Sequence, residues 1–150
     1  MTVKSSTGFR NHVLAVGSVK DALDGSELKL YGGAVPADAS AAESGTLLAT
    51  ITVNNSGTPV TFAATAESGV LAKNDTEIWS GLVTTGGTCT HYRLVSPTDS
   101  GATSPTEVRV QGSVGKIGAD LNVSDNVLVG AAIQNIDYFV VALPDRKSVV

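Results

Sequence analysis

From Glu27 onward, apolar and polar residues alternate along much of the chain, and a period of two is typical of half-buried β-strands. Residues 27–31 alternate in this way and end at Gly32 and Gly33. Turn segments rich in Gly, Asn and Ser separate this run from the others. The others are residues 46–53, 58–64, 76–84, 88–95, 107–114 and 133–143, with shorter strands about a turn at 124–126. We therefore predict about eight or nine strands, as in an antiparallel β-sandwich or barrel.

The first 25 residues follow a helical pattern instead. Phe9, Val13 and Val16 recur at roughly helical spacing, and Ser18 with Asp21 matches a helix N-cap followed by an acidic residue. This segment is either a short helix that leans on the sheet or an arm that reaches a neighbouring subunit. The predicted organisation is an N-terminal helical segment over 1–25, a β-sandwich domain over 26–144 and a flexible tail over 145–150.

Composition agrees with an all-β fold. The chain contains 20 Val, 16 Thr and 5 Ile, and β-branched side chains fit a pleated surface better than a helix. Only 16% of the residues are charged, which is below the usual share of about a quarter. Small polar and apolar residues must therefore cover much of the surface. Such a surface suits contact with other proteins, although it also fits a plain monomer.

Charge, hydropathy and cysteine usage exclude several classes of protein. The net charge of -4 has the wrong sign for a nucleic-acid binder, so we expect no nucleic-acid partner. No apolar run reaches the roughly 18 residues of a membrane span, so we expect no membrane partner. A single cysteine excludes a disulfide framework and a multi-thiolate metal site. The N-terminal residues lack the apolar core of a signal peptide, which favours synthesis and retention in a cytoplasm.

One pair of residues has the chemistry of a nucleophile and a base. Cys89 and His91 lie two positions apart in a predicted strand and so point to the same face. No oxyanion loop surrounds them, and packing beside Arg93 on the strand face is the alternative interpretation. The other histidine, His12, is expected at the surface or at an interface. We predict no catalytic residues and no enzyme activity.

Two ligand-binding patterns fail on inspection. Asp120, Asn122 and Ser124 have the spacing of the first calcium-loop ligands, but Asp125 and Ala131 replace the required glycine and glutamate. Residues 112–116 end in Gly-Lys, but Val110 and Ile117 break the phosphate-loop pattern at both ends. We therefore predict no metal site and no cofactor.

Several segments together resemble small virion proteins of tailed bacteriophages. They are residues 28–39 (LKLYGGAVPADA), 45–50 (GTLLAT), 92–94 (YRL), 110–115 (VQGSVG), 118–122 (GADLN) and 133–144, which includes IDYF. The resemblance covers roughly residues 9–144. It implies an all-β, jelly-roll-like antiparallel sandwich with a short N-terminal helix. It also implies a head decoration, or cement, protein that binds the outside of the capsid and stabilises the head.

The partners implied by the resemblance are the phage major capsid protein and other copies of the chain, as a homotrimer or dimer on the virion. The implied location is the capsid surface, after synthesis in the cytoplasm of the bacterial host. A tail or baseplate component is an alternative, and the position of the gene would distinguish the two. A carbohydrate-binding module is a second alternative, which exposure of Tyr31, Trp79 and Tyr92 in one groove would favour.

We expect the capsid contacts at the two ends of the chain, within residues 2–16 and 145–150. Both ends carry apolar side chains with no evident place in a sandwich. The candidates are Val3, Phe9, Val13, Val149 and Val150. The loop over residues 96–105, which is rich in Ser and Pro, is the alternative contact.

Overall fold

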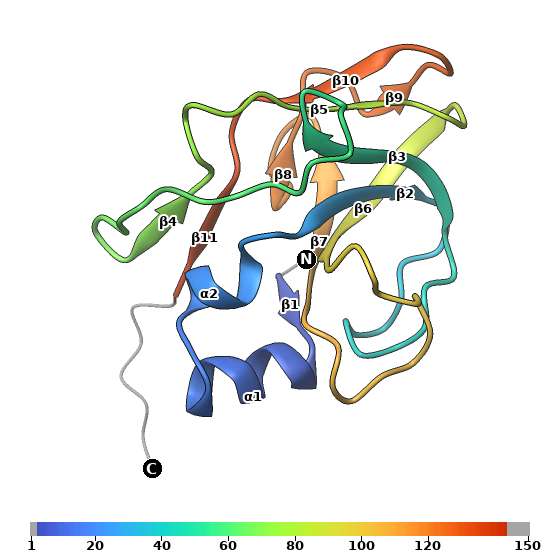
Figure 1. The fold of residues 1–150 in the computed structure, drawn as a ribbon. Helices are drawn as coiled ribbons and strands as arrows, with labels where there is room; N and C mark the ends of the chain where they lie inside the picture. The colour runs from blue at the N-terminus through green and yellow to red at the C-terminus, as the bar shows by residue number, and fades with distance from the viewer. Residues whose placement is uncertain (1–2, 144–150) are drawn as a thin grey trace.

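A computed structural model describes residues 3–143 and confirms the all-β antiparallel sandwich, with about 40% strand and 10% helix. A large twisted sheet and a small two-stranded sheet enclose the core, and two helices lie at one end (Figure 1). The first half of the elements comprises β1 (Lys4–Ser5), α1 (Thr7–Ala15), α2 (Val19–Leu23), β2 (Glu27–Gly32), β3 (Thr46–Val53) and β4 (Val70–Ala72). The second half comprises β5 (Trp79–Leu82), β6 (Gly87–Val95), β7 (Arg109–Gly115), β8 (Leu121–Asn122), β9 (Val127–Leu128), β10 (Ile133–Ile136) and β11 (Val140–Ala142).

The large sheet has the strand order β1-β7-β6-β2-β3-β5-β10. β8 pairs with β7 in parallel, and β9 pairs with β6. β4 and β11 form the small sheet. Within the described residues, β10 is therefore the edge strand at one end of the large sheet and β1 is the edge strand at the other.

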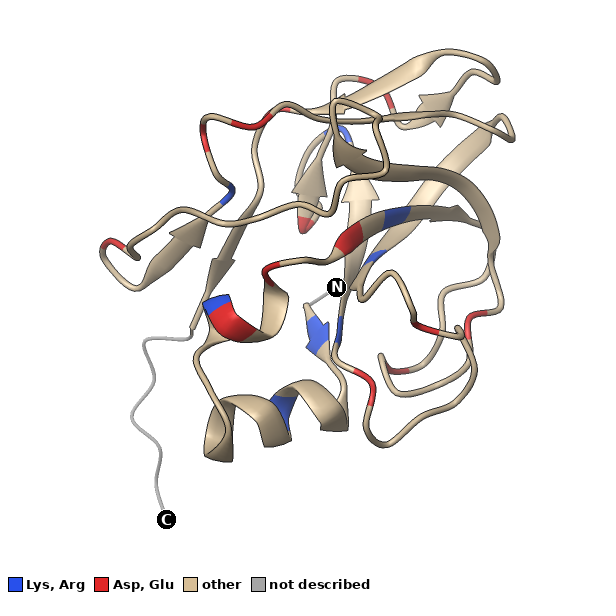
Figure 2. Ribbon diagram, viewed as in Figure 1, with Lys and Arg blue, Asp and Glu red and all other residues tan. Residues whose placement is uncertain are grey.

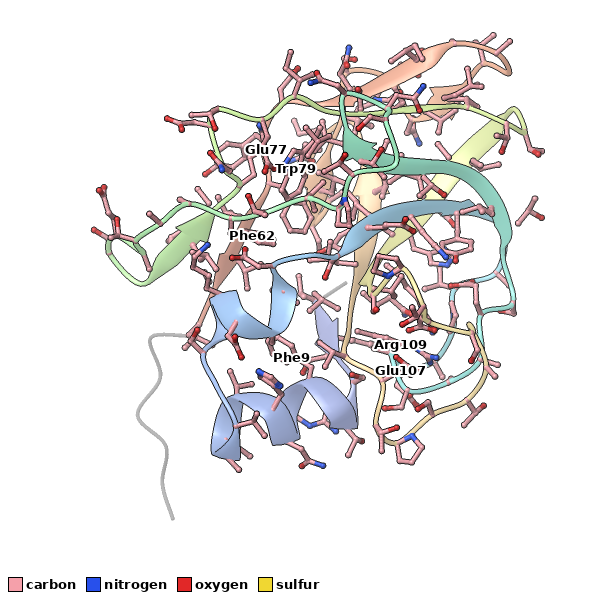
Figure 3. The ribbon with its side chains drawn as sticks, viewed as in Figure 1. Phe9, Phe62, Glu77, Trp79, Glu107 and Arg109 are labelled. Atoms are coloured by element: carbon pink, nitrogen blue, oxygen red, sulfur yellow. The ribbon has the colours of Figure 1, made fainter. Side chains whose placement is uncertain are left out.

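The core lies between the two sheets and contains most of the aromatic side chains. Trp79 is fully buried, as expected for the only indole, and its ring packs edge-on against Phe62 at 5.5 Å between centroids. Phe139 lies 5.6 Å from Trp79 and 5.4 Å from Tyr92. The indole Nε1 donates to Glu77 Oε2 at 2.9 Å, so this buried polar group is satisfied (Figure 3).

The strands β2, β6 and β7 are buried on both faces. Leu30 and Tyr92 face the apolar core, as the alternation predicts. The opposite, polar face carries Lys29, Arg93 and Gln111 in register across the three strands. The loops over residues 33–45 and 96–106 cover this polar face, and they are joined by a hydrogen bond from the Glu43 amide to the Gly101 carbonyl at 2.9 Å. The sheet therefore has a second buried layer, which is made of polar groups.

Three predicted strands differ from the observed ones. Residues 58–64 form isolated bridges rather than a strand, because side chains take their amides: Phe62 N donates to Asp24 Oδ1 and Thr61 N to Glu77. The predicted strand over 133–143 is two strands, β10 and β11, since Ile136 and Phe139 both enter the core three positions apart. The predicted pair within 121–129 does not form, because β8 and β9 pair with different strands.

The N-terminal segment packs on its own sheet. Ser6 caps α1 by accepting from the Phe9 amide at 3.1 Å, and Ser18 caps α2 by accepting from the Asp21 amide at 3.0 Å. Phe9 is buried in the core cluster, and Val13 packs against that cluster. The expectation that these two side chains have no place in the sandwich is therefore wrong.

Of the other predicted contact residues, Val3 is about half exposed. Val149 and Val150 lie outside the described residues. No helix within residues 3–143 is both long enough and apolar enough to cross a membrane.

Candidate functional site

Cys89 and His91 do not form a nucleophile–base pair. The hydrogen-bond partner of the Cys89 thiol is the backbone carbonyl oxygen of His91, at 3.7 Å, and not a nitrogen of the His91 ring. Burial raises the pKa of the Cys89 thiol to about 12, so the thiolate is not populated near neutral pH. The His91 ring is fully buried and is held at both nitrogens, by Glu43 at Nε2 and by Thr90 at Nδ1. The interpretation as strand-face packing beside Arg93 is the one that this geometry supports.

His91 belongs instead to a buried ionic cluster on the polar face of the sheet. Its Nε2 donates to Glu43 Oε1 at 3.0 Å, and Arg93 Nε lies 3.2 Å from Glu43 Oε2. Arg93 also donates through Nη2 to the carbonyl of Ala41 at 2.9 Å. The side chains of Glu43, His91 and Arg93 are 8% exposed or less. One loop carboxylate thus joins residues 33–45 to β6.

A second ion pair anchors the other loop in the same way. Arg109 on β7 donates from Nε to Asp99 Oδ2 at 2.7 Å and from Nη2 to Asp99 Oδ1 at 2.9 Å. This bidentate geometry is the strong form of the interaction, and both side chains are almost completely buried. Arg109 also donates to the Ala102 carbonyl, so it binds residues 96–106 at two points. Each loop therefore supplies one carboxylate for one arginine of the sheet.

The buried carboxylates should make the stability of the fold depend on acid pH. Burial alone would raise the pKa of Glu43, but hydrogen bonds from His91 and the Gly45 amide, with the charge of Arg93, hold it below its ordinary value. Burial opposes the shift at Asp99 too, where hydrogen bonds from Arg109 and the Gly101 amide lower the pKa. A carboxyl group whose pKa is lower in the folded state than in the unfolded state stabilises the fold at pH values above its unfolded-state pKa. This stabilisation is lost as the pH falls through the folded-state pKa.

We therefore expect the free energy of unfolding to fall as pH is lowered below about 4, the ordinary range of these carboxyl groups. Urea unfolding at a series of pH values measures it. The Asp99→Asn variant should show a weaker dependence on acid pH than the wild type. An equal dependence in both proteins would contradict the role given to Asp99.

The residues of the incomplete calcium-loop and phosphate-loop patterns have structural roles in the fold. Asp120 Oδ2 accepts hydrogen bonds from the amide and the hydroxyl of Ser113, and Asn122 Oδ1 accepts from the Ala119 amide. A Cβ at Gly112 would collide with the ring of Tyr92, so close packing explains this glycine. In residues 3–143, no group of three or more His, Cys, Asp or Glu side chains could hold a metal ion.

The aromatic residues that would favour a carbohydrate module do not lie in an open groove. Trp79 and Tyr92 are buried in the core, and Tyr31 is stacked on His91 with 5.3 Å between ring centroids and 9% exposure. These three residues therefore form no exposed aromatic surface, and the exposure that would favour a carbohydrate-binding module is not observed.

One end of the molecule carries no charged side chains over a long stretch of surface. Residues 46–66, 78–92 and 126–136 contain no Asp, Glu, Lys or Arg. They include β3, β5, β9 and β10, and Figure 2 shows the corresponding part of the ribbon in tan. We call this surface the uncharged edge. Its exposed large apolar side chains are Leu47, Ile78, Leu82, Val127, Val129 and Ile133.

Two of these side chains are neighbours on the free edge of the large sheet. Ile133 on β10 lies directly opposite Leu82 on β5, so both side chains point to the same face. They are 51% and 41% exposed, respectively. An edge strand with exposed apolar residues and no charge is a ready contact for another chain. This surface was not predicted from the sequence, although the three uncharged segments are visible there.

Comparisons of the chain with protein-family models, with curated proteins and with solved structures find no match.

Proposed function

We propose that this chain is a structural protein of a tailed-bacteriophage virion, which binds the outside of the capsid and stabilises the head. The observation that carries the proposal is the uncharged edge, together with the resemblance to phage virion proteins described above. The proposed partner is the major capsid protein. The proposed location is the outer surface of the virion.

The uncharged edge has the composition of the centre of a protein interface, where charged residues are depleted. Burying the exposed half of Ile133 and of Leu82 against a partner would contribute about 1 kcal/mol each before ordering costs. The loops over 33–45 and 96–106 are held by buried ion pairs, so the rest of the domain is a rigid platform for such a contact. A rigid body with an apolar edge supports the role of a cement protein.

We further propose that the protein is a homo-oligomer on the virion, with a trimer favoured over a dimer. Symmetric closure is the usual arrangement of identical subunits. Attachment of several subunits to one shell would convert weak single contacts into tight binding. The contact then need not be large on each subunit.

The substitution Ile133→Glu should weaken binding to capsids. A carboxylate on β10 would have to be desolvated in the contact, and the apolar contribution of the isoleucine would be lost. We expect the affinity to fall by about tenfold or more, since 1.4 kcal/mol corresponds to a factor of ten. Co-sedimentation with purified phage heads that lack the protein measures the bound fraction.

The matched control is Ile117→Glu, the same change at a residue that is 92% exposed and lies outside the uncharged edge. Ile117→Glu should bind like the wild type. Equal binding by both variants would remove the uncharged edge from the contact. Failure of the wild-type protein to bind heads, or its binding to isolated tails, would count against the proposed function itself.

A further inference from the structure

The backbone of β10 is open on one side. This strand ends the large sheet, so within residues 3–143 it pairs with β5 alone. Residues 131–133 and Asn135 are exposed, whereas Ile136 is buried in the core. An unpaired strand edge presents amides and carbonyls at regular spacing, and these groups are a template for another strand. Which residues of β10 supply such groups follows from its hydrogen bonds to β5.

The backbone groups of Ile133 point away from β5. In an antiparallel pair, residues that exchange hydrogen bonds alternate with residues whose groups point outward. The Leu82 amide, directly opposite Ile133, points to the other side of β5 and donates to Asn55 Oδ1 at 3.0 Å. The next amide, that of Val83, points toward β10 and donates to the Ala132 carbonyl at 2.9 Å. Leu82 and Ile133 are therefore not a hydrogen-bonded pair, and the amide and carbonyl of Ile133 lie on the open side.

Asn135 repeats this orientation two positions further on. It lies opposite Ser80 in the same register, so its backbone groups also point outward. Among residues 3–143, no hydrogen bond from outside the β5–β10 pair reaches the Ile133 amide, the Ile133 carbonyl or the Asn135 amide. The Asn135 carbonyl accepts from Gln134 Nε2 at 2.9 Å. The open side of β10 thus offers two donors and one acceptor, and a second acceptor that a side chain covers.

The surroundings of β10 favour an uncharged strand as the occupant. Natural edge strands are often protected by a charged side chain, a proline or a bulge, but Ile133–Ile136 has no charge and no proline and pairs with β5 without a register shift. A charged side chain on an added strand would find no counter-ion on the uncharged edge and would have to be desolvated there. The exposed side chains of Leu82 and Ile133 would lie on one face beside the added strand, which favours apolar residues on that face.

We propose that the capsid partner binds by strand addition, with an extended, uncharged segment of the partner pairing with β10 through the outward groups of Ile133 and Asn135. This inference rests on the proposed function and specifies how the partner binds at the same contact. The added strand continues the large sheet beyond β10. Main-chain hydrogen bonds then provide much of the affinity, and the apolar face provides the selectivity.

A second copy of the chain fits this edge less well. Antiparallel pairing of two β10 strands through both outward positions places Ile133 opposite Asn135 of the other copy, so both Asn135 carbonyls have to accept across the pair. Each of these carbonyls is covered by its own Gln134 side chain, and both side chains would have to move. A different partner strand meets this obstacle only once. Pairing between two copies would also close the edge in a dimer and leave no open strand for the shell.

The decisive variant is Asn135→Pro, with Asn135→Ala as its matched control. Proline removes the outward N–H and puts its ring in the path of an added strand, but it takes no hydrogen bond from the β5 ladder and is tolerated at such edge positions. Alanine removes the side chain and keeps the N–H. In co-sedimentation with heads that lack the protein, Asn135→Pro should bind at least about tenfold more weakly than Asn135→Ala, which should bind like the wild type. Thermal unfolding of both variants checks that they are folded.

Hydrogen exchange of the wild type provides a second test that needs no variant. The amides of Ile133 and Asn135 should exchange at least about tenfold more slowly on heads than in the free protein, whereas the amide of Ile117, outside the uncharged edge, should not change. Equal binding by the two Asn135 variants, or unchanged exchange at Ile133 and Asn135, overturns strand addition while the capsid role stands. Failure of the wild type to bind heads overturns the proposed function and strand addition together.

Sedimentation of the free protein tests the other occupant. We expect the wild type and Asn135→Pro to have the same oligomeric state in solution. If the wild type associates and Asn135→Pro does not, the edge belongs to a second copy of the chain, and the proposal is overturned.

Discussion

Replacing Glu43 by alanine should lower the free energy of unfolding by about 3–5 kcal/mol, because it leaves the buried His91 without its acceptor and the buried Arg93 without its counter-ion. The Glu43 carboxylate accepts from His91 Nε2 and lies 3.2 Å from the Arg93 Nε. Its loss would leave the guanidinium of Arg93 with no counter-ion in direct contact. Since a domain of this size is stable by only about 5–15 kcal/mol, the loss is large. Equilibrium urea unfolding measures it.

The control for this variant is Glu67→Ala, which removes an exposed carboxylate from the turn before β4. Surface substitutions of this kind usually change stability by no more than about 0.5 kcal/mol. Glu43→Gln should lie between the two, because it keeps an oxygen acceptor for His91 but removes the charge that faces Arg93. If Glu43→Ala were as stable as Glu67→Ala, the loop would not be held by this carboxylate.

Replacing Trp79 by alanine should cost a similar amount, about 3–5 kcal/mol, for a different reason. The indole is completely buried between Phe62 and Phe139, so its removal leaves a cavity that the neighbouring rings cannot fill without moving. It also removes one of the two donors to Glu77 Oε2, the other being the Thr61 amide. Because Trp79 is the only tryptophan, the unfolding must be followed by circular dichroism.

Two further variants separate packing from hydrogen bonding at this position. Trp79→Phe retains most of the aromatic volume but not the indole N–H, so its cost should be well below that of alanine. Tyr138→Ala truncates an aromatic side chain that is 70% exposed and should leave stability nearly unchanged. A result in which Trp79→Ala and Tyr138→Ala are equally stable would contradict the assignment of Trp79 to the core.

The sandwich was predictable from the sequence because its strands obey local rules. Residues 27–31 and 46–53 alternate in the way that a strand with one apolar face requires, and the observed β2 and β3 follow them closely. The cap of α2 was also predictable, since Ser18 and Asp21 carry the signal within four consecutive positions. These features depend on neighbours in the chain.

The strands that were predicted wrongly depend on distant partners. The amides of Thr61 and Phe62 bond to Glu77 and Asp24, and no local pattern indicates that side chains replace a strand there. Phe9 was assigned to an interface because an amphipathic helix gives the same pattern whether it packs on its own sheet or on a neighbour. Only the tertiary contacts distinguish the two.

The buried ionic cluster was only partly visible in the sequence. The alternation placed His91 and Arg93 together on one strand face, but it did not indicate that two loops cover that face. Glu43 and Asp99 lie 48 residues before His91 and 10 residues before Arg109, in loops whose paths the sequence does not determine. The alternative contact loop over 96–105 is therefore anchored through Asp99, whereas the uncharged edge offers the exposed apolar surface.

The proposed function is tested most directly by a cryo-microscopy reconstruction of phage heads with the purified protein bound. We expect density for the protein on the outer surface of the capsid, with β10 and the turn before it against the shell and the α1 and α2 end directed away. Density confined to the tail or baseplate would contradict the account. So would a capsid-bound domain whose uncharged edge faces solvent.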